Sequence, residues 1–86
     1  MSYDYQREKQ ALFTDEGQKT FLKVRDNAHR LLEMSGVADM QSLWRGLSGD
    51  NWELMACVER LVELGELVEV PQQGDVFAQH RIFKWR

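Results

Sequence analysis

The sequence predicts a small α+β domain in which three main helices precede a C-terminal β-hairpin. Apolar residues recur at helical spacing up to residue 64, and two runs typical of strands follow, residues 67 to 70 and 76 to 86. The single proline opens the turn between these runs. A chain of 86 residues, 43% of them hydrophobic, has room for one core. We therefore expect one folded domain, residues 14 to 86, preceded by an N-terminal arm, residues 1 to 13.

The first main helix is expected between Thr14 and Gly36. Thr14 is a good N-cap, the acids Asp15 and Glu16 suit the positive end of a helix, and Gly36 is a good stop. The inward-facing residues at helical spacing are Phe21, Val24, Ala28, Leu31 and Leu32. Residues 1 to 12 lack a clean period, and the sequence leaves open a mobile arm, a packed extended segment or a short helix.

Two further helices are expected before the hairpin. Residues 37 and 38 form a short link, after which Asp39 can cap a helix. Its inward-facing residues are Met40, Leu43, Trp44 and Leu47. A turn at residues 48 to 50 then leads to a third helix, which Asp50 caps and Gly65 ends.

The third helix has two faces of different character. Projected at about 100° per residue, the buried arc holds Leu54, Met55, Cys57, Val58, Leu61, Val62 and Leu64. The outer arc holds Trp52, Glu53, Ala56, Glu59, Arg60 and Glu63. Between residues 50 and 75 seven acids face one base, a local charge of −6, whereas residues 80 to 86 carry three bases and no acid. The charge is therefore distributed unevenly along the chain.

Three stretches carry a family resemblance. "QSLWRGLSG" (41 to 49) resembles the second helix and turn of the winged helix-turn-helix superfamily. "VERLVELGELVEV" (58 to 70) resembles its third helix running through glycine into the first wing strand, and "PQQGD" (71 to 75) looks like the wing tip. The similarity covers residues 15 to 85, with about two extra residues before the core of the third helix. It implies a small winged-helix domain that binds DNA and regulates transcription.

The charge of the third helix argues against that implied function. In DNA-binding relatives its outer arc enters the major groove, where phosphates repel carboxylates. The leading hypothesis is therefore a non-enzymatic module that binds a protein with a basic surface. The expected protein-binding residues are Trp52, Glu53, Glu59, Arg60 and Glu63. Trp52 is either an exposed interface anchor or folds back on Trp44 or on the turn before the helix.

Two alternatives stay open. A transcriptional regulator would contact the phosphates of double-stranded DNA through the wing and the first helix. Its candidate residues are Lys19, Lys23, Arg81, Lys84 and Arg86. The lysines can instead belong, with Arg30, to a solvated face paired with Asp26 and Glu33, and the tail can be a packed strand with a charged edge. A homodimeric structural subunit would use Tyr3, Tyr5 and the second apolar face of the hairpin.

The remaining residues argue against several functional classes. Cys57 is the single cysteine, so no intramolecular disulfide forms, and with His29 and His80 it gives no zinc spacing. We expect Cys57 to be an inert core thiol. Neither histidine has a neighbour that suggests a catalytic base, and no phosphate-binding loop is present, so we expect no enzyme activity, metal or cofactor. With no secretory signal and no apolar run near ~20 residues, a cytoplasmic protein without membrane contact is expected.

Overall fold

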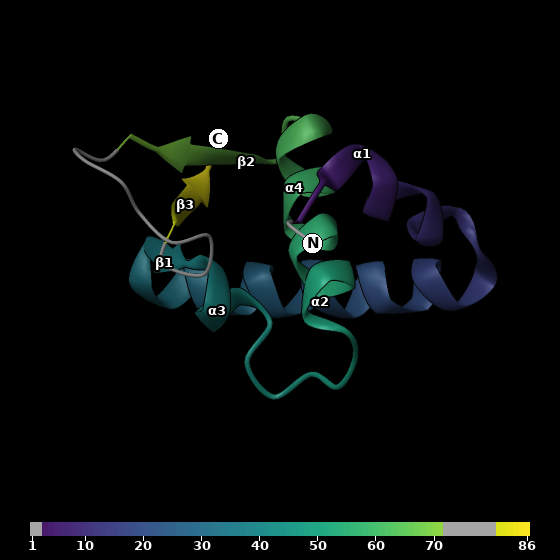
Figure 1. Cartoon of the computed structure of the whole chain (residues 1–86). Helices are drawn as coiled ribbons and strands as arrows, with labels where there is room; N and C mark the ends of the chain where they lie inside the picture. The colour runs from purple at the N-terminus through teal and green to yellow at the C-terminus, as the bar shows by residue number, and fades with distance from the viewer. Residues whose placement is uncertain (1–2, 72–80) are drawn as a thin grey trace.

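A computed structural model describes residues 3–71 and 81–86 and has an α+β architecture. Within these residues the elements follow the order α1, the 3-10 helix η1, α2, β1, α3, α4, β2 and β3. In Figure 1 α2 runs along one side of the molecule, and α4 stands between the three-stranded sheet and the N-terminal helix α1. Helix α4 is therefore covered from two directions, by the sheet and by the N-terminal residues.

Helix α2 (Asp15–Ser35) begins and ends as the sequence predicts. The Thr14 hydroxyl caps it by accepting a hydrogen bond from the Gly17 N–H at 3.0 Å. Gly36, with φ of 79°, ends the helix and donates its N–H to the Leu32 carbonyl. The buried residues of its inner face are Phe21, Val24, Ala28 and Leu32. The predicted boundaries and inner face of this helix are confirmed.

Residues 37 and 38, expected to form only a short link between two helices, belong to a strand. That expectation was wrong. Strand β1 (Val37–Asp39) pairs antiparallel with β3 (Ile82–Trp85), and Val37 lies opposite Lys84. A three-residue strand has no period of its own in the sequence. It forms here because β3 supplies partners for its backbone N–H and C=O groups.

Helices α3 (Met40–Leu43) and α4 (Asn51–Glu63) both have the predicted caps, but α3 is shorter than expected, because Trp44 is its C-cap and Leu47 lies beyond it. The Asp39 and Asp50 side chains each accept a hydrogen bond from a backbone N–H of the first turn, at 2.8 and 2.7 Å. Gly65, with φ of 81°, reverses the chain just after α4. The L-x-x-L-G-x-L phrase thus marks an abrupt passage from helix to strand.

Strand β2 (Leu67–Val70) pairs antiparallel with β3, so the sheet order is β1-β3-β2. The predicted strand at residues 67 to 70 is confirmed. The second predicted strand, residues 76 to 86, is confirmed at residues 82 to 85. Its beginning and most of the expected wing tip, residues 72 to 80 together, lie outside the described residues.

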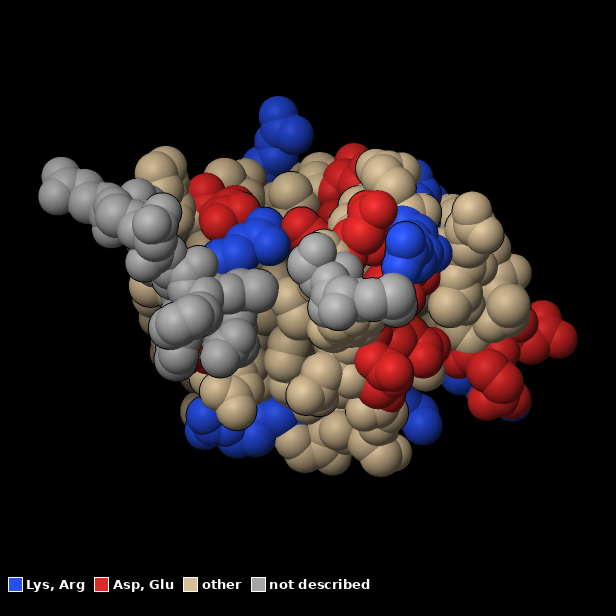
Figure 2. Space-filling model, viewed as in Figure 1, with Lys and Arg blue, Asp and Glu red and all other residues tan. Residues whose placement is uncertain are grey.

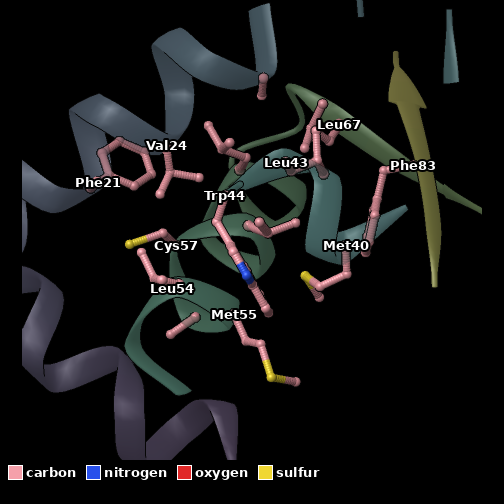
Figure 3. Close-up of a cluster of buried hydrophobic side chains, with 14 of the residues drawn as sticks. Phe21, Val24, Met40, Leu43, Trp44, Leu54, Met55, Cys57, Leu67 and Phe83 are labelled. Atoms are coloured by element: carbon pink, nitrogen blue, oxygen red, sulfur yellow. The ribbon is translucent and has the colours of Figure 1, made fainter. Parts of the chain in front are cut away.

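The core lies where α2, α3, α4 and the sheet converge, and Figure 3 shows side chains from these elements pointing toward one another. Two residues of α4 differ from the helical projection. Ala56, expected on the outer arc, is fully buried, because α1 and η1 pack against that side of α4. Leu64, expected inside, is 48% exposed, because it is the C-cap and lies beyond the last residue with regular helical geometry.

The N-terminal residues form short helices packed on the domain, one of the three possibilities that the sequence left open. Helix α1 (Tyr5–Glu8) is followed directly by η1 (Lys9–Phe13). Leu12 is 1% exposed and belongs to the core. A Cβ at Gly17 would lie 1.9 Å from the Ala11 carbonyl oxygen, so only glycine allows α2 to start this close to η1.

Candidate functional site

The outer face of α4 is, over much of its length, an internal contact surface. The Tyr3 hydroxyl donates a hydrogen bond to Glu59, and the Tyr5 hydroxyl donates one to Glu63 at 3.0 Å. Burial, and then the hydrogen bond to a carboxylate, raise the pKa of both phenols, so both stay protonated donors. Two of the glutamates expected to meet a partner therefore already have donors from the same chain.

Glu63 is the centre of a second set of contacts. Lys9 Nζ lies 2.9 Å from a Glu63 carboxylate oxygen, and Arg60 donates to the other oxygen from one turn earlier on α4. The hydrogen bonds from Lys9 and then from Arg60 hold the pKa of Glu63 down at about 2. Arg60 also lies over the Phe13 ring, 5.3 Å from its centroid. These contacts join η1 to the C-terminal half of α4.

Arg81 ties Glu59 to the sheet. Its guanidinium lies 3.2 Å from Glu59 and donates to both oxygens of Glu69 on β2, at 2.7 and 3.0 Å. The hydrogen bond to Glu69 is the main reason that the pKa of Arg81 is raised. Because two carboxylates share this cation, its charge is compensated within the chain. That arrangement makes Arg81 less suited to a phosphate than the sequence alone indicates.

The N-terminal end of α4 is more open. Trp52 is half-buried, and the Tyr3 ring meets it edge-on with the ring centroids 6.3 Å apart. Trp52 also borders a pocket of about 310 Å³. The residues that line this pocket are Gln41, Trp44, Asn51, Trp52 and Met55. Glu53, the next residue, is half-buried and pairs with no cation within residues 3–71 and 81–86. Trp52 thus packs on Tyr3 and shares a pocket with Trp44.

The candidate DNA contacts lie on two different elements. Lys19 on α2 pairs with Glu16 at 3.6 Å, and Arg30 donates to Asn27. Asp26 and Glu33, which were expected to pair with this face, make no ion pair in the described part of the chain, so that expected pairing was wrong. Lys23, Lys84 and Arg86 are exposed. Figure 2 shows acidic and basic side chains next to one another rather than a surface of one sign.

The homodimer alternative depended on Tyr3, Tyr5 and one face of the hairpin. Both tyrosines donate their hydroxyls to α4 of the same chain. On the sheet, Lys84 lies between Val37 on one side and Val68 on the other, and Val37 is 49% exposed. The tyrosines are therefore engaged inside the chain, whereas this sheet face carries exposed apolar surface.

Other chemistry-bearing residues have structural roles. Cys57 is fully buried, and burial raises the pKa of its thiol to about 12, as an inert core thiol requires. The His29 ring on α2 packs on the Trp85 ring of β3 with the centroids 4.2 Å apart, a contact that no sequence signal pointed to. The described residues contain no group of three or more His, Cys, Asp or Glu side chains that could hold a metal ion. Nor do they include a helix of the length and apolar character needed to span a membrane.

The comparisons with known proteins give no relative. No protein-family model matches the chain, and no curated protein and no solved structure matches it. Function is therefore inferred from the geometry of α4 and of the segment packed on it.

Proposed function

We propose that the chain is a non-enzymatic winged-helix module that binds a protein partner with a basic surface through the outer face of α4. The succession α2, α3, α4, β2 and β3 agrees with the order that the family resemblance implies, with β1 added as the third strand of the sheet. The acidic residues of the outer face favour a partner with basic side chains. Carboxylates at this position attract basic side chains and repel a phosphate backbone.

The contacts of Glu59 and Glu63 carry this proposal. Each carboxylate accepts hydrogen bonds from a tyrosine hydroxyl and from a cation of a distant segment, which is the chemistry a basic protein surface would supply. The pocket beside Trp52 adds a recess of mixed character at the open end of the same face, lined by the Trp44 and Met55 side chains together with the polar Gln41 and Asn51. A tryptophan next to a recess is a common anchor of protein interfaces. The face thus combines an anchor, at Trp52, with Glu53, which pairs with no cation among the described residues, and with Glu59 and Glu63, whose present partners belong to the same chain.

The DNA-binding alternative has less support on this surface. Arg81, a candidate phosphate contact, is already shared between Glu59 and Glu69, so its charge is compensated within the chain. Lys84 and Arg86 remain exposed on and after β3 and would have to provide most of the phosphate contacts. Titration with mixed-sequence duplex DNA at low salt decides this point, since even weak electrostatic binding appears there.

The test of the proposal is site-specific photo-crosslinking in cells that express the full chain. A photoreactive amino acid replaces Asn51, which lines the Trp52 pocket, and in the control it replaces Glu33, which is exposed on α2. We expect a defined protein adduct from position 51 alone, and its loss with Trp52→Ala or Glu53→Lys. Adducts of equal yield from both positions, or an adduct at position 51 that is insensitive to Trp52→Ala, would count against the proposal. Binding of duplex DNA with NMR shifts at Lys84 and Arg86 would favour the alternative.

A further inference from the structure

Residues 3 to 9 lie over the acidic half of α4 and are here called the cover. We propose that the cover is displaceable, and that the surface beneath it, Glu59 and Glu63 with Ala56, is the second half of the partner site. The partner segment that replaces the cover presents the same chemistry, hydroxyl donors together with a lysine or arginine. This inference rests on the proposed function, because it names the partner chemistry and the regulation of that same site.

The cover is held by contacts that are individually weak. Helix α1 has four residues and none of them is buried. Such a short helix is not stable by itself, because the entropy cost of forming the first turn exceeds the free energy gained from its few hydrogen bonds. The Tyr3–Glu59 hydrogen bond is part-buried and is the strongest of these contacts. The Tyr5–Glu63 hydrogen bond is exposed, and the Lys9–Glu63 ion pair is partly exposed. Polar contacts of this kind contribute little net free energy, so the cover can open at modest cost.

The residues that follow the cover are firmly attached. Leu12 is in the core, and the Ala11 carbonyl oxygen lies against Gly17 and accepts a hydrogen bond from the Thr14 hydroxyl at 2.8 Å. The Gln18 side-chain amide donates to the Leu12 carbonyl. The change from weak to firm attachment falls between Lys9 and Ala11. Opening there releases the cover while Leu12 and α2 keep their places.

Opening would leave an incomplete set of contacts on α4. Glu59 would retain Arg81 and lose the Tyr3 hydroxyl, whereas Glu63 would retain Arg60 and lose both the Tyr5 hydroxyl and Lys9. A carboxylate accepts several hydrogen bonds, so both groups would have capacity for donors from another chain. Ala56, fully buried under the cover side, is small enough for a partner backbone to approach. Removal of Tyr3 from the edge of Trp52 would join this strip to the Trp52 pocket.

The cover binds its site more readily than a free segment does, because it is covalently attached close to that site. A segment attached to its own site through a few residues acts at an effective concentration of about millimolar. A partner therefore binds this half of the site only if its own donors are better placed or more strongly charged. The cover thereby discriminates against weak basic ligands, while the Trp52 end stays accessible to all of them.

The test uses the full chain labelled with ¹⁵N and a synthetic peptide with the sequence of residues 3 to 9, YDYQREK. The loosened chain carries Tyr3→Phe and Tyr5→Phe, which remove both hydroxyls and keep both rings. We expect millimolar peptide to shift the amides of residues 56 to 63 and the Trp52 indole of the loosened chain, with an apparent affinity roughly fivefold higher than for the wild type. The control peptide has phenylalanine for both tyrosines and glutamine for both the arginine and the lysine, and it should bind neither chain.

Two outcomes overturn the inference. One is equal binding of the two peptides to the loosened chain. The other is peptide binding that persists when Glu59→Gln and Glu63→Gln are added. If the loosened chain does not melt cooperatively, Lys9→Gln replaces it, since that variant removes one exposed contact. None of these readouts uses the adduct at position 51, so failure of the proposed function and failure of this inference give different results.

Discussion

The Tyr3 hydroxyl donates a hydrogen bond to Glu59, a residue 56 positions later in the sequence. This bond connects the beginning of the chain to the middle of α4 and places the Tyr3 ring edge-on to Trp52. Because Glu59 also receives Arg81 from the C-terminal strand region, three distant segments meet at one carboxylate. The surface expected to bind a partner is thus also the surface on which the N-terminal residue Tyr3 and the C-terminal residue Arg81 contact α4.

The first prediction concerns this bond. Tyr3→Phe removes the hydroxyl while Glu59 keeps Arg81, so we expect a loss of about 1 kcal/mol in the free energy of unfolding. For a domain of this size that loss lowers the melting temperature by roughly 4–8 °C. Thermal unfolding followed by circular dichroism measures the change. Tyr5→Phe is the matched control and should cost less, because its bond to Glu63 is exposed; a larger effect for Tyr5→Phe would contradict this assignment.

The second prediction concerns pH. The pKa of Glu63 is lowered from 4.5 to about 2, so the unfolded state takes up the proton more readily than the folded state. The ionised carboxylate therefore stabilises the fold fully above pH 4.5, and this contribution is lost as the pH falls from 4.5 to about 2. Melting temperatures of the wild type should decline over that window more steeply than those of Glu63→Gln. Parallel curves for the two proteins would show that Glu63 does not hold its partners in solution.

The third prediction separates two cations of the C-terminal segment. Arg81 donates to Glu59 and Glu69, whereas Lys84 is exposed and pairs with no acid among the residues that the structure describes. Arg81→Met should therefore lower the free energy of unfolding by about 1–2 kcal/mol, and Lys84→Met should change it by less than about 0.5 kcal/mol. Urea unfolding of the two variants provides the measurement. If the two losses are equal, the bridge from Arg81 to α4 is not formed in solution.

The helices could be predicted from the sequence because their signals are local. Thr14, Asp39 and Asp50 are caps whose effect extends over one turn, and Gly36 and Gly65 allow the left-handed turns that end α2 and α4. The apolar period of α2 also predicted its buried face. Strand β1 could not be predicted in the same way, because its hydrogen bonds go to β3, more than forty residues away in the sequence.

The candidate site was predicted in composition but not in its contacts. The sequence showed that the outer face of α4 is acidic, and it could not show that Tyr3, Tyr5 and Lys9 occupy that face. These residues belong to a segment without a hydrophobic period, and the information that positions it lies elsewhere. Gly17, near the start of α2, is the local feature that corresponds to this packing, because a Cβ there would lie 1.9 Å from the Ala11 carbonyl oxygen.

The final prediction concerns Ala56 and Leu64, whose burial is the opposite of what the helical projection indicated. Ala56 is fully buried beneath the N-terminal helices, so Ala56→Leu inserts volume into a filled space and should cost about 1–3 kcal/mol. Leu64 is 48% exposed at the C-cap, so Leu64→Ser should change the free energy of unfolding by less than about 1 kcal/mol. A helix with its outer face in solvent would give the opposite order, with Ala56→Leu tolerated. Chemical unfolding of both variants therefore tests directly whether the N-terminal segment covers α4.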